Sequence, residues 1–101
     1  MDAHNLDELS VYRAKINNLN EDLLNLLCLR FEVIKEVSLL KKAHKIEVMQ
    51  PDRVTEIIEF SRTYFSNREL DPDLIAPIFE KIIEQACVLE ETMMSPGEDG
   101  Q

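Results

Sequence analysis

The chain has 101 residues, of which 45% are apolar and 31% charged, with only two Gly and four Pro. This composition predicts a helical domain and excludes collagen-like, disulfide-scaffold and low-complexity chains; the few Gly and Pro also leave little material for the turns of a β-sandwich. A formal net charge of −9 argues against nucleic acid or an anionic membrane surface as a partner, since both repel an acidic protein.

The sequence contains no apolar run long enough to span a membrane and no secretion signal, which predicts a cytoplasmic protein. Cys28 and Cys87 form no Cys-x-x-Cys pair and are interpreted as small residues on helix faces. His4 and His44 have no neighbouring Cys or His at ligand spacing. We therefore expect neither a metal ion nor a cofactor.

From Asp7 to Gln50 the sequence contains neither Gly nor Pro. Its apolar residues recur in heptad-like steps, which predicts one long helix from Asp7 to about Ala43. At 1.5 Å per residue this helix is roughly 55 Å long, more than the width of a globule of this size. The apolar residues form two lines: Leu9, Ile16, Leu23 and Val37 on one, and Tyr12, Leu19, Leu26, Val33 and Leu40 on the other.

Two shorter helices are predicted next, each introduced by a Pro beside acidic residues. Pro suits the first helical position, so the second helix is expected to begin at Pro51 and to end near Ser66. Asp71-Pro72-Asp73 repeats the signal, with Asp71 as the N-cap of a third helix that ends near Met94.

The predicted organisation is one all-α domain over residues 1–94 and a disordered polar tail over residues 95–101. One long and two shorter helices cannot form a compact three-helix bundle without leaving part of the long apolar face in water. The simplest partner for that face is a second copy of the chain. The sequence therefore predicts a homodimer in which the long helices pack together.

Two cations lie on one face of the long helix. Arg30 occupies a position where the pattern calls for an apolar residue, and an unpaired buried guanidinium costs several kcal/mol. Lys41 lies eleven residues further on, so the two side chains point the same way about 16 Å apart, with Ile34 and Val37 between them. Such a slot, apolar in the middle and positive at both ends, fits a small dianion. Alternatively, Arg30 bridges a buried Glu.

Arg13 lies about 25 Å from Arg30 along the helix and cannot reach the same small ligand within one chain. In an antiparallel dimer it could enter the slot of the other subunit, which would make the dimer the active unit. Alternatively, it is a solvated residue on the helix surface.

Two further charged residues have open interpretations. Glu90 lies on the apolar face of the third helix, where it is either the buried partner of Arg30 or Lys41 or a protonated carboxyl that donates a hydrogen bond. Arg53, close to the positive end of the second helix, serves a ligand or pairs with Glu56.

Taken together, these residues resemble the all-α chorismate mutases. The motif Leu-x-x-x-Arg-x-x-Ile-x-x-Leu-x-x-x-Leu-Leu-x-Leu-Leu-x-x-Arg runs from Leu9 to Arg30, and Phe-x-x-Ile-Ile-Glu-x-x-x-x-x-Glu ends at Glu90. The resemblance covers about residues 6–94 without a gap. It implies an intertwined homodimer with two shared active sites, and a Claisen-type [3,3]-sigmatropic rearrangement of a chorismate-like dianion without a cofactor.

The resemblance also implies residue roles. In that family the residue matching Arg13 comes from the other subunit and, with the match of Arg30, binds the substrate carboxylates. The match of Lys41 contacts the ether oxygen and a carboxylate, and the match of Glu90 hydrogen-bonds the ether oxygen. Arg53 matches a further polar contact.

Three departures from the family pattern alter the pocket around ring position 4 of the substrate. Val54 replaces the Glu that usually receives the ring hydroxyl, Gln50 replaces an Asp at the pocket mouth, and Ala86 replaces a Ser. Two motifs, Met49-Gln50-Pro51-x-Arg53-Val54 and Cys87-x-x-Glu90-x-x-x-Met94-Ser95, look most like those of the 4-amino-4-deoxychorismate mutases of antibiotic pathways, which supply precursors of p-aminophenylalanine. Three alternatives stay open: a chorismate mutase of aromatic amino-acid biosynthesis, an isochorismate pyruvate lyase, and a non-catalytic helical dimer.

Overall fold

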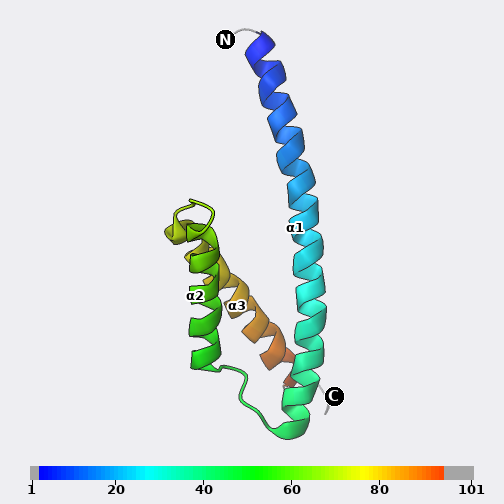
Figure 1. Ribbon diagram of the computed structural model, residues 1–101. Helices are drawn as coiled ribbons and strands as arrows, with labels where there is room; N and C mark the ends of the chain where they lie inside the picture. The colour runs from blue at the N-terminus through cyan, green and yellow to red at the C-terminus, as the bar shows by residue number, and fades with distance from the viewer. Residues whose placement is uncertain (1–2, 95–101) are drawn as a thin grey trace. The chain divides into compact units, whose positions relative to one another are not determined.

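The computed structural model describes residues 3–94, with side chains described from Asp7 onward, and shows three helices (Figure 1). They are α1 (Ala3–His44), α2 (Pro51–Ser66) and α3 (Pro72–Met94). The prediction of an all-α fold with one long and two shorter helices is confirmed. α1 begins earlier than the predicted Asp7, because no Gly or Pro precedes that residue to stop the helix. The predicted disordered tail, residues 95–101, lies outside the described residues.

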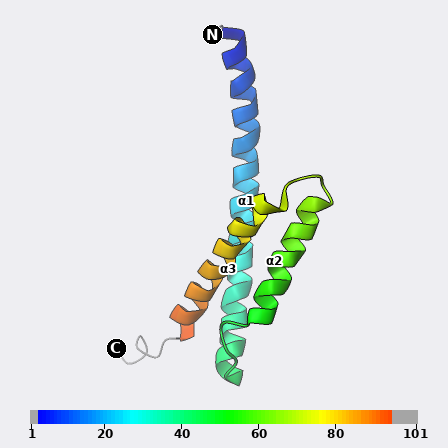
Figure 2. The same cartoon turned by 90° about the vertical axis from the view of Figure 1, so that its left-hand side faces the viewer.

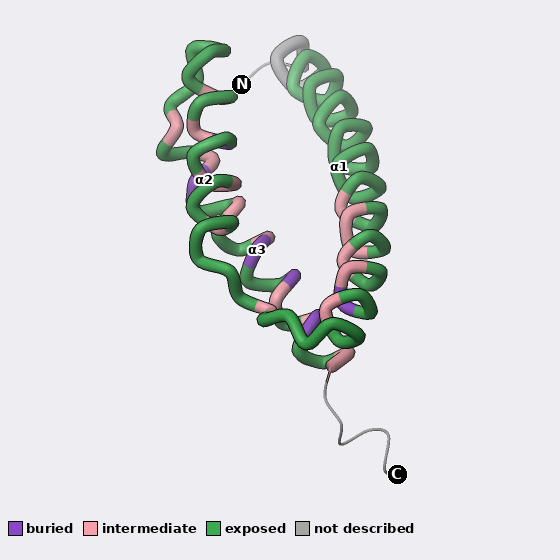
Figure 3. Tube along the Cα trace, turned by 60° about the horizontal axis from the view of Figure 1, so that its bottom comes forward, coloured by how far each residue is buried: buried purple, intermediate pink, exposed green. Residues whose placement is uncertain are grey.

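The chain divides into two compact units, Met1–Val33 and Ile34–Gln101, and α1 crosses the boundary between them. In the described part of the first unit the chain is a single helical segment. All side chains from Asp7 to Leu26 are exposed (Figure 3). A single helix has no second element of its own unit against which to bury an apolar face.

The exposed side chains of α1 include both predicted apolar lines except Val37, which is half-buried. Leu19 and Leu26, for example, are 64% and 62% exposed. Large apolar side chains exposed in this number on one helix indicate an interaction surface. Those of α1 are Leu9, Val11, Tyr12, Ile16, Leu19, Leu23, Leu24, Leu26, Leu29, Val33, Leu39 and Leu40.

In the second unit, α2 and α3 run antiparallel and pack against each other (Figure 2). The buried apolar residues among those described all lie on α3: Ala76, Ile83 and Ala86. An ion pair of 3.0 Å between Arg62 and Asp73 links the two helices at the surface. None of the described helices is both long and apolar enough to cross a membrane.

The turns that join the helices use two residues with left-handed backbone conformation. Lys45 has φ 56° after α1, and Glu69 has φ 61° after α2. In each case the next residue donates a backbone hydrogen bond back into the last turn of the helix, which ends the helix in the Schellman manner. Before α3, the Asp71 carboxylate accepts a hydrogen bond of 2.9 Å from the Asp73 N–H, which confirms Asp71 as the N-cap.

Candidate active site

A buried ion pair joins the end of α1 to the end of α3. Lys41 Nζ lies 2.8 Å from Glu90 Oε1, and the two side chains are 14% and 6% exposed. Both residues belong to the second unit, in which the C-terminal end of α3 lies beside the last turns of α1 (Figure 1). The sequence left Arg30 and Lys41 open as partners of Glu90, and the structure shows the pairing with Lys41.

The lysine is also held by the segment between α1 and α2. Lys41 Nζ donates a hydrogen bond of 3.0 Å to the main-chain carbonyl of Val48, seven residues further along the chain. The Lys41 main-chain carbonyl accepts a hydrogen bond of 2.8 Å from the Ile46 N–H. Residue 41 is therefore bonded to this segment through both its backbone and its side chain.

The contact between Lys41 and Glu90 is an ion pair by distance but not a directional hydrogen bond. Glu90 Oε1 is fully buried and accepts no hydrogen bond of good geometry from the described residues. The 2.8 Å separation still gives strong charge attraction, which depends on distance far more than on angle. The oxygen thus keeps its capacity to bond a ligand atom placed beside it.

Cys87 lies one turn before Glu90 on α3 and responds to the same charges. Burial raises the pKa of the Cys87 thiol, the negative charge of Glu90 raises it further, and the positive charge of Lys41 partly opposes the increase. A thiol with a raised pKa stays protonated at neutral pH and is a poor nucleophile. This agrees with the interpretation of Cys87 as a small residue on a helix face.

Three of the predicted apolar site residues lie on the helix faces that carry the pair. Val37 precedes Lys41 by one helical turn and Ile34 by two, and both are half-buried. Ala86, which precedes Glu90 by one turn, is only 5% exposed.

The predicted arginine ligands of α1 belong to the first unit. Arg13 is exposed and Arg30 is half-buried, and neither forms a hydrogen bond or ion pair with the other described residues. Arg30 and Lys41 fall in different units, so the slot predicted between them stays a prediction.

The start of α2 carries the remaining predicted residues. Arg53 is exposed and its guanidinium lies 2.8 Å from Glu56 Oε1, the pairing considered from the sequence. Val54 is half-buried in the first turn of the helix. Gln50, at the N-cap position, is exposed, and its side chain donates a long hydrogen bond of 3.4 Å to the Glu47 carbonyl.

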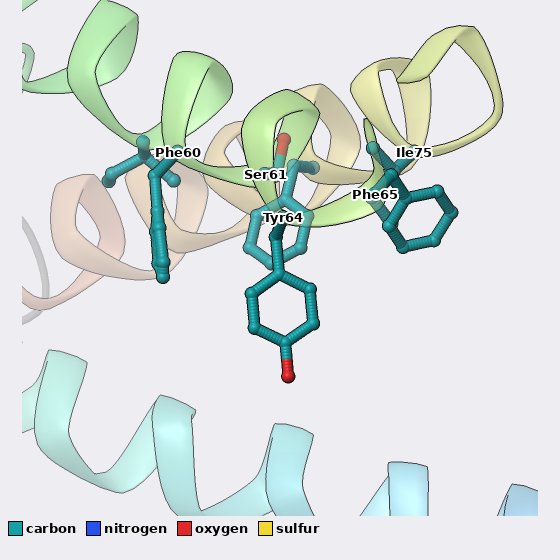
Figure 4. Close-up of a pocket in the computed structure, with 7 residues that line it drawn as sticks. Phe60, Ser61, Tyr64, Phe65 and Ile75 are labelled. Carbon is teal, nitrogen blue, oxygen red and sulfur yellow. The ribbon is translucent and has the colours of Figure 1, made fainter. Parts of the chain in front are cut away.

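Two hollows on α2 lack the charge that a dianion requires. An apolar cavity of about 320 Å³ lies between α2 and α3 (Figure 4), where the Phe60 and Tyr64 rings project from the same side of α2. A more open hollow of about 360 Å³ is bordered by Glu56 and Glu59, which would repel an anion. The buried Lys41–Glu90 pair is therefore the better candidate site. The lining residues of the apolar cavity are Ile57, Phe60, Ser61, Tyr64, Phe65, Ile75 and Phe79.

Sequence reasoning missed two features of the second unit. Ser38, one turn before Lys41, is only 1% exposed, and its hydroxyl donates a hydrogen bond of 2.8 Å to the Ile34 carbonyl. The sequence signal for Ser38 was its polar side chain inside an apolar stretch of the helix. The Val48 carbonyl is a main-chain group outside any helix, and no side-chain pattern could have identified it.

The Lys41–Glu90 pair places a cation and a carboxyl group side by side, both largely buried. An ammonium there can donate a hydrogen bond to an oxygen atom that gains negative charge, and a protonated carboxyl can do the same. No group of three or more His, Cys, Asp or Glu that could hold a metal ion occurs among the described residues.

Comparisons with known proteins agree with this chemistry. The family model described as Chorismate mutase type II matches residues 12–91. A 4-amino-4-deoxychorismate mutase of Streptomyces pristinaespiralis is 24% identical over 91 residues, which cover 90% of this chain and 70% of the relative.

Two further relatives match nearly the same region. A 4-amino-4-deoxychorismate mutase of Streptomyces venezuelae is 27% identical over 89 residues, 88% of this chain and 86% of the relative. The T-protein of Enterobacter agglomerans is 25% identical over 83 residues, which cover 82% of this chain but 22% of the T-protein. The family match includes all the charged residues considered above: Arg13, Arg30, Lys41, Arg53 and Glu90.

Proposed function

Because the chain belongs to the type II chorismate mutase family and is an enzyme of that family, we propose that it rearranges 4-amino-4-deoxychorismate to 4-amino-4-deoxyprephenate. The observation that carries this proposal is the buried Lys41–Glu90 pair at 2.8 Å, which places an ammonium donor beside a carboxyl group as the rearrangement of an ether substrate requires. The two 4-amino-4-deoxychorismate mutases that match most of the chain support the amino substrate. A cytoplasmic location and a role in antibiotic biosynthesis stay predictions.

The reaction breaks the ether C–O bond of the substrate and forms a C–C bond within the same molecule. All six electrons that move belong to the substrate, so the rearrangement needs no nucleophile, metal ion or redox cofactor. The protein has two tasks: to hold the substrate in its compact diaxial shape and to stabilise the negative charge that grows on the ether oxygen.

We assign these tasks to separate residues. Arg30 and the partner subunit's Arg13 bind the two carboxylates, and Lys41 assists at one of them. Lys41 donates a hydrogen bond to the ether oxygen as the C–O bond lengthens, and Glu90 does the same once it carries a proton. One such donor lowers the barrier by roughly 3 to 4 kcal/mol. Ile34 and Val37 supply the apolar wall of the site.

The same proposal requires a homodimer. The exposed apolar side chains of α1 need a covering surface, and the α1 helix of a second copy offers a matching set. An antiparallel pairing brings the partner subunit's Arg13 to the site that contains Lys41. Each dimer then holds two complete active sites.

Arg53 is available to a ligand despite its pairing with Glu56. The two side chains are 63% and 67% exposed, and an exposed pair of this kind contributes at most about 1 kcal/mol. A substrate carboxylate can therefore replace Glu56 as the partner of Arg53 at little cost.

Substrate choice depends on the group at ring position 4. We propose that Val54, Ala86 and Gln50 surround this position. Val54 and Ala86 remove the carboxylate and hydroxyl groups with which the family usually meets a ring hydroxyl. The site is thus altered where 4-amino-4-deoxychorismate and chorismate differ.

The substrate is tested by following 4-amino-4-deoxychorismate, chorismate and isochorismate in parallel assays with product identification. We expect the amino substrate to have the highest kcat/KM, by about tenfold or more. Val54→Glu should increase turnover of chorismate, because its carboxylate accepts a hydrogen bond from the ring hydroxyl. Preferred turnover of chorismate by the wild type would contradict the substrate assignment, and pyruvate release from isochorismate would indicate a lyase. A bicyclic transition-state mimic that failed to raise Tm would contradict the mutase proposal itself.

The role of Glu90 is tested by substitution. The Glu90→Gln variant should keep its turnover of 4-amino-4-deoxychorismate, since an amide also donates a hydrogen bond to the ether oxygen. Loss of turnover in Glu90→Gln, or wild-type turnover in Glu90→Ala, would remove Glu90 from the donor role.

A further inference from the structure

Among the described residues, the Lys41 ammonium donates a directional hydrogen bond of 3.0 Å to the main-chain carbonyl of Val48. We propose that Val48 is a positioning residue, whose main-chain carbonyl holds the Lys41 ammonium at the place where it serves a ligand. This inference rests on the proposed function for the catalytic role of Lys41. The geometry that it invokes can be tested without turnover.

The hydrogen-bond directions at the pair carry the inference. Lys41 Nζ is 2.8 Å from Glu90 Oε1, close enough for a hydrogen bond, yet that oxygen accepts none of good geometry. The directional bond goes to the Val48 carbonyl instead. An ammonium group has three donors, so this arrangement leaves two donors for a ligand and keeps Oε1 open to the same ligand.

The segment between α1 and α2 restrains the position of the Val48 carbonyl. Lys45 adopts a left-handed conformation, and the Ile46 N–H bonds back to the Lys41 carbonyl. Val48 is half-buried, whereas every residue from Lys42 to Glu47 and from Met49 to Arg53 is exposed. The Val48 side chain is therefore the one apolar anchor of the stretch, and its burial fixes the position of its own carbonyl.

Such an anchor matters because lysine has a long, flexible stem. Without a second partner, an ammonium beside a buried carboxylate would direct its donors to that carboxylate, which would leave fewer of them for a ligand. A displacement of about 1 Å in a catalytic group can lower the rate by about 100-fold. The Val48 carbonyl opposes that displacement without adding a charge.

The experiment compares Val48→Gly, which removes the anchor, with Val48→Ile, which keeps it, and with Met49→Gly as a control at an exposed neighbour. We expect Val48→Gly to lower kcat by about tenfold to 100-fold with KM changed by less than about threefold. Val48→Ile and Met49→Gly should stay within about twofold of the wild type. Circular dichroism and the oligomeric state should be the same for all variants.

A second readout reports the lysine directly. In protein labelled with ¹⁵N-lysine, the Lys41 ammonium resonance is assigned by its loss in Lys41→Ala, and its hydrogen exchange with water is measured. We expect faster exchange and a shifted resonance in Val48→Gly, and wild-type behaviour in Val48→Ile. Val48→Ala replaces Val48→Gly if the glycine variant does not fold.

The outcomes separate the two proposals. An unchanged Lys41 resonance and unchanged kcat in Val48→Gly would overturn the positioning role, and so would equal effects of Met49→Gly. If the wild type rearranges none of the substrates but the Lys41 resonance still responds to Val48→Gly and not to the control, the positioning role stands and the proposed function fails.

Discussion

Replacement of Lys41 by alanine is expected to lower kcat by about 1,000-fold while the chain keeps its helical fold. The variant loses a donor to the ether oxygen, an effect of about 100- to 1,000-fold by itself, and a contact that holds the substrate in its reactive shape. Turnover of 4-amino-4-deoxychorismate, measured at saturating substrate, checks this expectation.

The stability of that variant needs its own control, because alanine leaves Glu90 buried without its cation. Loss of one partner from a buried ion pair is destabilising. The double variant Lys41→Ala with Glu90→Gln removes the uncompensated charge and should regain Tm without regaining activity. Lys42→Ala changes the adjacent exposed lysine and should keep wild-type kcat. Normal turnover by Lys41→Ala would exclude Lys41 from the mechanism.

Two inactive variants are expected to restore activity to each other when they form mixed dimers. If each site takes Arg13 from one subunit and Lys41 from the other, an Arg13→Ala chain paired with a Lys41→Ala chain has one fully intact site and one doubly damaged site. Random pairing makes half of the dimers mixed, so about a quarter of all sites are intact. Equal amounts of the two variants, refolded together from denaturant, should therefore show about a quarter of wild-type activity.

The matched control combines Lys41→Ala with Glu90→Ala. Both residues lie in the same unit of one chain, so every site of a mixed dimer lacks one of them and no activity should return. Mass spectrometry of the refolded samples confirms that mixed dimers form. Two results would contradict active sites shared between subunits. One is activity restored in the control pair, and the other is no activity in the test pair although mixed dimers form. A monomeric protein in light scattering would contradict the dimer.

Local sequence patterns were sufficient to predict the three helices. Gly-free and Pro-free sequence predicted the long helix, and Pro51 and Pro72 marked the starts of the other two, because helix starts depend on neighbouring residues alone. The N-cap role of Asp71 followed for the same reason, and its hydrogen bond to Asp73 is present. The exposed apolar lines of α1 also followed from periodicity, since 3.6 residues per turn determine which residues share a face.

The sequence by itself thus determined the helices, their faces, and the placement of Lys41 and Glu90 on faces suited to burial. Only the tertiary structure decided that Glu90 meets Lys41 rather than Arg30, because periodicity tells which side chains share a face but not which faces meet. The hydrogen bond from Lys41 to the Val48 carbonyl could not be predicted from the sequence either. Every residue has such a carbonyl, and only the path of the chain between two helices decides which one reaches a lysine seven residues away.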